Sequence, residues 1–135
     1  MDIHPLALTV LTPQRQVVVA QVDAAFLPGL LGELGILPGH TPLLALLGTG
    51  ELRYTIGGRD HYLVISGGFA EVSCDKVLVQ ADMGETPEEI NVAHALAEQK
   101  EAEALLKTTY GDELTAATAK LARATTRIKV AERNA

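Results

Sequence analysis

The chain has 135 residues and a mass of 14.3 kDa, enough for one ordinary domain or a small domain with an appendage. Hydrophobic residues make up 47% and charged residues 21%, so the chain can bury a core and does not have the composition of a disordered protein. The net charge of −6 argues against a duplex nucleic-acid binder, and the single cysteine excludes a disulfide framework and a multi-cysteine metal site.

The first part of the chain, up to Glu85, alternates short strand-like runs with glycine and proline. Eleven of the twelve glycines and five of the six prolines precede Glu85. Turn pairs such as Gly57-Gly58 and Gly67-Gly68 separate the runs. Many short strands at close spacing predict an N-terminal antiparallel β-sandwich or flattened barrel over residues 1–85. The predicted strands are residues 6–11, 16–22, 24–27, 43–47, 51–56, 61–65, 69–72 and 76–80.

Residues 32–44, GELGILPGHTPLL, are too rich in Gly and Pro for a helix and too apolar for a free loop. The glycines and prolines favour one backbone path, which we expect to present Glu33 and His40 and to bury Leu34 and Ile36. A rigid loop with exposed polar groups is typical of a docking surface. The structural alternative is a tight corner of the sandwich.

Residues 86–135 have the composition of a C-terminal antiparallel two-helix hairpin. Thr86 is a predicted N-cap, and Pro87 fits the first position of a helix over residues 87–107. Gly111 suits a left-handed helix end, and Asp112 suits the cap of a second helix over residues 113–132. Both helices rely on alanine, which favours helix but buries little surface, so we expect weak docking on the sandwich. The alternative is a static hairpin packed on the sheet.

Charge is distributed unevenly along the chain. Residues 1–86 carry a net charge of −5 and residues 87–110 carry −3, whereas residues 111–135 carry +2. Lys120, Arg123 and Arg127 recur at helical spacing in this last, positive segment. Such a basic face either is simply solvated or attracts an acidic partner.

The sequence predicts no active site. It lacks a nucleophile elbow, a phosphate-binding loop and a metalloprotease motif, and His4, His40, His61 and His94 have no metal-ligand spacing. We therefore expect no catalytic residue, metal or cofactor. We also expect no secretory leader, because the first residues lack a basic stretch and a small-residue cleavage site, and the apolar runs are far shorter than the roughly 20 residues that span a bilayer.

Two motifs give the chain a family likeness. The segment at residues 32–44, followed by ISGGFAEV at residues 65–72, resembles the epsilon subunit of F-type ATP synthase of the bacterial or plastid type. That family carries G-E-L-G-I-x-P-G-H-x-P-L-L and then x-x-G-G-x-x-E-V at this separation. The resemblance implies a β-sandwich of about ten strands followed by a two-helix C-terminal domain.

The resemblance also implies a function, that of a non-catalytic central-stalk subunit that couples the gamma subunit to the c-ring. Its hairpin would extend into the catalytic alpha/beta hexamer and inhibit ATP hydrolysis. By this likeness Glu33, His40, Thr41 and Pro42 are expected contacts of the c-ring or stalk. Lys120, Arg123 and Arg127 would meet an acidic segment of the catalytic beta subunit. The expected location is the cytoplasmic face of the bacterial plasma membrane, reached only through the complex.

Some members of the family sense ATP with an I/L-D-x-x-R-A motif on the first helix and arginines on the second. Here the motif is broken, because Ile90 is followed by Asn91 in place of Asp and His94 stands in place of Arg. A neutral imidazole is a poor substitute for a guanidinium against phosphate. Arg123 and Arg127 still match the second-helix arginines, so these five residues are weak ATP-binding candidates and we expect no ATP binding.

Two other functions compete with the stalk subunit. One is a separate nucleotide-sensing module that binds ATP through the hairpin. The other is a small β-sandwich enzyme that uses Glu33 and His40 as an acid–base pair, although nothing in the sequence supplies a nucleophile or an orienting partner.

Overall fold

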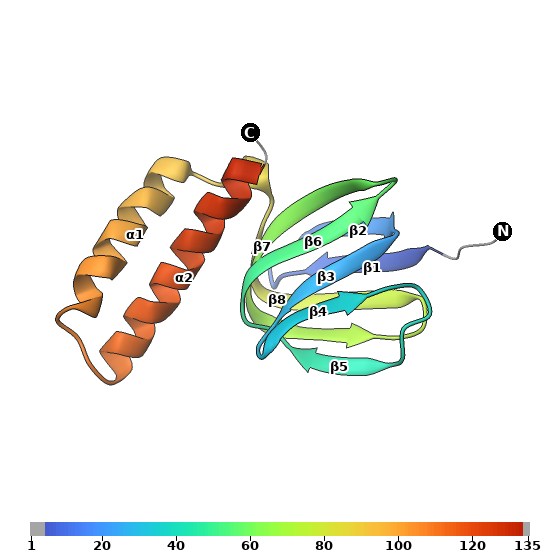
Figure 1. Cartoon of the computed structure of the whole chain (residues 1–135), viewed down its shortest axis with the longest axis horizontal. Helices are drawn as coiled ribbons and strands as arrows, with labels where there is room; N and C mark the ends of the chain where they lie inside the picture. Colours follow the sequence, from blue (N-terminus) through green and yellow to red (C-terminus); the bar gives the residue numbers. More distant parts are fainter. Residues whose placement is uncertain (1–4, 134–135) are drawn as a thin grey trace.

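The computed structural model describes residues 5–133, so His4 lies outside the described residues. Within this range eight strands are followed by a helical hairpin, as predicted (Figure 1). The strands are β1 (Leu6–Leu11), β2 (Gln16–Val22), β3 (Ala24–Gly29), β4 (Gly32–Ile36), β5 (Leu43–Leu46), β6 (Thr49–Ile56), β7 (Arg59–Val72) and β8 (Lys76–Glu85). The helices are the short 3₁₀ turn η1 (Pro87–Glu89), α1 (Val92–Leu106) and α2 (Asp112–Arg133).

The long strand β7 joins the two layers of the sandwich. Its first half pairs antiparallel with β6, which pairs in turn with β3 and then β4. Its second half pairs with β5 on one side and β8 on the other, and β8 continues to β1 and β2. All these pairs are antiparallel except β1 with β8, which is parallel.

The core lies entirely within the sandwich. Its cluster of buried side chains begins at Leu6 and ends at Ala81, so every member comes from the strand region. Leu8, Leu27, Leu52 and Ile65 are fully buried members. Because no helix residue belongs to this cluster, the sandwich fills its own interior with residues that precede the hairpin.

Two features of the sandwich differ from the sequence prediction. Residues 32–36, expected to lie in a loop, form β4, which pairs with β3 from Ala25–Ile36 to Gly29–Gly32. Gly67-Gly68, expected to be a turn, lies inside β7, so two predicted strands are one. The merger removes one predicted strand and β4 adds one, so the described residues hold eight strands where the family likeness implied about ten. By contrast, Gly57-Gly58 does form a turn, between β6 and β7.

The first helix begins later than predicted and the second begins one residue earlier. Pro87 opens only the 3₁₀ turn, whose Thr86 backbone N–H and hydroxyl both donate to Glu89 Oε1, at 2.8 and 2.9 Å. Helix α1 is capped instead by Asn91, whose side-chain oxygen accepts the His94 N–H at 3.0 Å. Gly111 takes the predicted left-handed conformation with φ of 62°, and Asp112 is the first residue of α2 rather than its cap.

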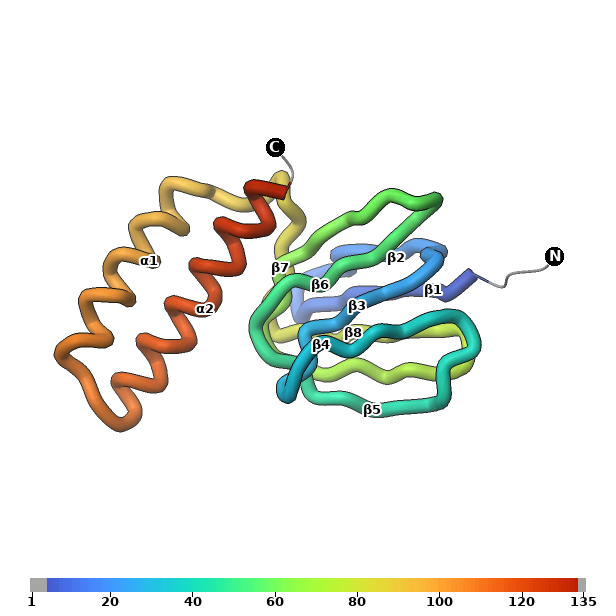
Figure 2. Tube along the Cα trace, viewed as in Figure 1, coloured from blue at the N-terminus to red at the C-terminus, as the bar shows by residue number. Residues whose placement is uncertain are grey.

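The helices form a separate layer, and only α2 lies against the sandwich (Figure 1). The tube in Figure 2 shows the two helices side by side, with α1 on the outer side of α2. α1 buries only Ala95 and Ala102, whereas α2 buries Ala117, Ala124, Thr126 and Val130. Small side chains bury little apolar area, which agrees with the expected weak docking.

Replacing Gly68 by Ala is expected to destabilise the sandwich by about 3 kcal/mol or more. Gly68 has φ of +105°, and a Cβ there would overlap the backbone carbonyl oxygen of Gln80 on β8. Gly57→Ala is the matched control, because its φ is +57° but no atom lies within 4 Å of the added carbon. Its cost should be only the backbone strain, about 1–2 kcal/mol. Chemical denaturation followed by circular dichroism measures both, and equal losses would contradict the role of close strand approach at Gly68.

Candidate functional site

Four exposed leucines gather where the β3–β4 turn meets β5. We call Leu30, Leu31, Leu44 and Leu46 the leucine patch; their exposed fractions are 61%, 102%, 68% and 65%. The two segments are adjacent, since the Leu30 N–H donates to the Leu46 carbonyl at 2.9 Å. They line an open groove of about 450 Å³. Clustered exposed leucines on a small domain mark an interaction surface.

Glu33 lies in the same groove, at the start of β4. Its side chain is exposed, as expected, while Ile36 at the end of β4 is fully buried and Leu34 is half-buried. The predicted docking residue Glu33 is therefore part of the surface that carries the leucine patch.

His40, Thr41 and Pro42 form the loop beyond β4, at the other end of that strand. The Gly39 N–H donates to the Cys74 carbonyl at 2.6 Å, which ties this loop to the β7–β8 turn. His40 Nδ1 bonds the Thr41 carbonyl at 2.6 Å, so that nitrogen carries the proton. Thr41 and Pro42 are exposed, and His40 is half-buried.

The structure does not bring Glu33 and His40 together. They are separated by the length of β4, about 10 Å from Glu33 to Ile36 at the usual rise per residue. A general acid and base must lie within hydrogen-bond reach of the same substrate atoms. The geometry therefore gives no support to an acid–base pair of these two residues.

Arg127 occupies the centre of the junction between the hairpin and the sandwich. Its Nε and Nη2 donate to the two carboxylate oxygens of Glu85, at 2.8 and 3.2 Å. Its Nη1 donates to Glu98 of α1 at 2.8 Å and lies 3.2 Å from Nδ1 of His94. The Arg127 side chain is only 11% exposed. One guanidinium thus links the end of β8 to both helices.

Two other cations of α2 pair with a sandwich carboxylate. Arg133 donates to both oxygens of Glu51, and Lys129 Nζ lies 3.8 Å from the same group. The hydrogen bonds that Arg133 donates to Glu51, together with the charge of that carboxylate, raise the pKa of Arg133 above its usual value. Glu51 belongs to β6, so these contacts also join α2 to the sandwich.

The remaining predicted basic residues differ from one another. Lys120 pairs with Glu101 of α1 at 2.8 Å, a contact within the hairpin. Arg123 is partly buried and forms no ion pair within residues 5–133. The predicted basic face is thus partly neutralised by the chain's own carboxylates. Sequence reasoning missed these acidic partners, because pairing between strands and helices depends on tertiary placement rather than on spacing.

Of the weak ATP-binding candidates, the structure joins Asn91, His94 and Arg127. Asn91 caps the helix that carries His94, and His94 contacts Arg127. Ile90 precedes that cap, and Arg123 lies one turn before Arg127 on α2. The Arg127 guanidinium, however, already donates to two carboxylates.

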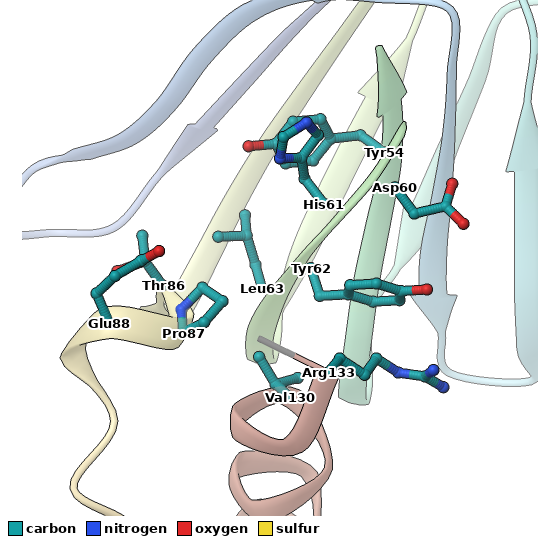
Figure 3. Close-up of a pocket in the computed structure, with 10 residues that line it drawn as sticks. All are labelled: Tyr54, Asp60, His61, Tyr62, Leu63, Thr86, Pro87, Glu88, Val130 and Arg133. Atoms are coloured by element: carbon teal, nitrogen blue, oxygen red, sulfur yellow. The ribbon is translucent and has the colours of Figure 1, made fainter. Parts of the chain in front are cut away.

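A small pocket of about 150 Å³ lies where α2 ends against β6, β7 and η1 (Figure 3). Arg133 stacks over Tyr62, with its guanidinium carbon 4.6 Å from the ring centroid. Tyr54 and His61 stack on one another at 5.0 Å on the same side. Burial and the neighbouring Glu88 raise the pKa of Tyr54. Asp60, Glu88 and Arg133 line the pocket together with the aromatic rings, so this part of the helix–sandwich contact is largely polar.

Comparison with known proteins gives matches over both parts of the chain. Residues 5–87 match the model of the ATP synthase delta/epsilon chain β-sandwich domain, and residues 88–132 match its long α-helix domain. The chain is 45% identical to an ATP synthase epsilon chain of Dehalococcoides mccartyi, covering 95% of this chain and 93% of that one. It is 43% identical to ATP synthase epsilon chain 1 of Syntrophotalea carbinolica, with 95% and 94% coverage.

A chain of the mitochondrial ATP synthase of Euglena gracilis, solved as OSCP/F1/c-ring, shares the fold. It superposes with a TM-score of 0.82 at 24% identity, covering 96% of this chain and 82% of that one. In the part of the chain that the structure describes, neither helix combines the length and apolar character that a membrane crossing requires.

The link between the domains should have a pH-dependent anchor at Glu89. The Thr86 N–H and then Arg15 hold the pKa of Glu89 below its usual 4.5, so its contribution to stability exists above that pH and is lost as the pH falls through the lowered pKa. Both partners are solvent-exposed, so Glu89→Gln should cost about 1 kcal/mol or less near neutral pH.

Thermal unfolding of wild type and Glu89→Gln at neutral and acidic pH measures this effect. Glu88→Gln is the control, because Glu88 lies in the same turn and forms no ion pair within residues 5–133. A difference between wild type and Glu89→Gln that persists in acid, when both side chains are neutral, would contradict the assignment.

Proposed function

The chain belongs to the ATP synthase delta/epsilon family, and we propose that it is a non-catalytic central-stalk subunit of an F-type, proton-translocating ATP synthase. In this role it couples the gamma subunit to the c-ring and inhibits ATP hydrolysis through its hairpin. The observation that carries the proposal is the likeness to epsilon chains over 95% of the chain, both domains included. The complex holds the subunit at the cytoplasmic face of the bacterial plasma membrane.

The sandwich supplies the stalk-facing surface. The leucine patch offers apolar area for a protein partner, and Glu33 lies beside it. The loop with His40, Thr41 and Pro42 adds polar contacts whose backbone is fixed by its bond to Cys74. We assign this surface to gamma and to the polar loops of the c-ring, since a rigid rim with an apolar centre is the usual anatomy of a protein interface.

The hairpin supplies the regulatory part. Its helices pack on one another through small side chains, and the sandwich core is complete without them. Both facts support a hairpin that leaves the sandwich as a unit and reaches the catalytic hexamer. Lys120, Arg123 and Arg127 would then face an acidic segment of the beta subunit.

Truncation after Thr86 is expected to leave a folded sandwich that still assembles, while inhibition of ATP hydrolysis is lost. The cut preserves β8, which extends to Glu85 and pairs with Val64 there. The measurement compares assembly and ATPase rates of complexes that contain the full or the truncated chain. Equal ATPase rates at equal assembly would overturn the inhibitory role while leaving the coupling role in place.

The complementary variant is Leu31→Asp with Leu44→Asp, which keeps the hairpin and changes only the leucine patch. Both side chains are exposed, so the fold should tolerate the change. This variant should assemble at least tenfold more weakly, because a charge in an apolar interface must be desolvated. Normal assembly of the double variant would place the stalk contact elsewhere on the sandwich.

The alternative, a nucleotide sensor, finds less support in the geometry. Arg127 is the second-helix arginine nearest the broken motif, and Glu85 and Glu98 already accept its hydrogen bonds. A phosphate would have to displace both carboxylates. His94, a histidine in place of the motif's arginine, would supply positive charge only in its protonated form.

We therefore expect no heat when ATP is titrated into the full chain by calorimetry at about pH 6 or about pH 8, on either side of the usual pKa of histidine. The matched control is Asn91→Asp with His94→Arg, which rebuilds the family motif in the same helix. Saturable binding by the wild-type chain would favour the nucleotide sensor. Binding by the control alone would assign the loss to these two positions.

A further inference from the structure

We propose that an ionic latch in the C-terminal half of α2 holds the hairpin on the sandwich. The latch consists of an inner pair, Arg127 with Glu85, and two outer pairs, Arg133 and Lys129 with Glu51. Breaking these pairs releases the hairpin with its two helices still packed together. The inference concerns how the docked state is maintained, and its link to inhibition rests on the proposed function.

The inner pair contributes most of the stabilisation that the latch provides. Arg127 makes a two-point contact with Glu85, whose side chain is 20% exposed, and Arg127 itself is 11% exposed. Two parallel N–H···O bonds fix both position and orientation, and partial burial limits screening by solvent. Glu85 is the last residue of β8, so this contact anchors α2 beside the point where the chain leaves the sandwich.

The outer pairs lie further along α2, where Lys129 is two residues and Arg133 six residues beyond Arg127. Glu51 is 17% exposed, whereas Arg133 and Lys129 are 44% and 59% exposed. Arg133 also covers the Tyr62 ring, as Figure 3 shows. These contacts are more open to water than the inner pair, so each is worth less.

The other half of α2 is not held in this way. Figures 1 and 2 show α2 close to the sandwich at its C-terminal end and further from it toward the α1–α2 turn. An open groove of about 590 Å³ separates this half, at Leu114 and Thr118, from the sandwich at Leu30 and Gly48. Within residues 5–133, the ion pairs between α2 and the sandwich all involve residues 127–133 of the helix.

The contacts within the hairpin survive release. Arg127 keeps Glu98, Lys120 keeps Glu101, and the alanines between the helices stay buried. Release therefore exposes Val130 and frees part of the Arg127 guanidinium, but it does not unpack the helices. In the proposed function, Arg127 can bind an acidic partner only after its ion pair with Glu85 is broken. Docking of the hairpin on the sandwich and contact with the partner therefore exclude one another.

Thiol labelling of the isolated full chain measures release directly. In a Cys74→Ser background, Val130→Cys places a thiol at a fully buried position at the end of α2, beside Leu63 and Arg133. Its labelling rate is proportional to the undocked fraction. Glu85→Gln should raise this rate about tenfold, because it leaves a part-buried guanidinium with one carboxylate. Glu51→Gln should raise it about threefold, as expected for exposed pairs.

Two controls separate release from general loosening. Glu101→Gln removes an ion pair that lies within the hairpin, so the Val130→Cys rate should not change. Ala102→Cys reports a site buried between the helices, and its rate should stay constant in every latch variant. Higher salt should speed labelling at position 130 in the parent chain and less so in the Glu51→Gln, Glu85→Gln double variant.

An unchanged rate at position 130 in Glu85→Gln would overturn the latch, as would equal acceleration at positions 102 and 130. The assay contains no ATP synthase, so these outcomes are independent of the proposed function. The opposite combination is also informative. If the latch variants label faster but truncation leaves the ATPase rate unchanged, the latch stands and the inhibitory role is wrong.

Discussion

The arrangement of the two domains depends on the hydrogen bonds that Arg127 donates to Glu85 and Glu98. A guanidinium has five donors in a rigid plane, and here they are divided between a strand end and a helix. Because the side chain is mostly buried, removing either carboxylate leaves N–H donors of the guanidinium without their partner. The helices contribute little apolar area of their own, so the geometry of this charge cluster decides where α2 sits.

The sequence predicted the architecture well where its patterns are local. The ends of β1 and β2, the Gly57-Gly58 turn and the left-handed Gly111 all follow from strand periodicity and turn chemistry. The family likeness carried by residues 32–44 and 65–72 is confirmed by matches over both domains.

Local patterns fail where a residue's role depends on a distant neighbour. Gly67-Gly68 has the composition of a turn, but β7 bends there without ending, because β8 pairs with it on both sides of the two glycines.

The candidate interaction surfaces also combine features that local sequence predicts with features that only the tertiary structure reveals. Exposure of Glu33, Thr41 and Pro42 was foreseeable from the glycines and prolines around them. The leucine patch was not, because Leu30 and Leu44 look like core residues in a sequence so rich in leucine. Only the pairing of β3 with β4, and the approach of β5 to the β3–β4 turn, places them outside the core. Likewise, the sequence did not predict that three of the five cations of α2 pair with the sandwich, because the positions of Glu51 and Glu85 beside the helix follow only from the tertiary structure.

The continuity of β7 has a mechanical consequence. The same fourteen-residue strand carries β5 on its second half and β6 on its first half. The leucine patch includes β5 residues, and the Glu51 end of the helix contact belongs to β6. A displacement of β5 therefore reaches β6 through the hydrogen bonds that each makes with β7 and along the backbone of that single strand. A sandwich built this way resists shear between its two layers.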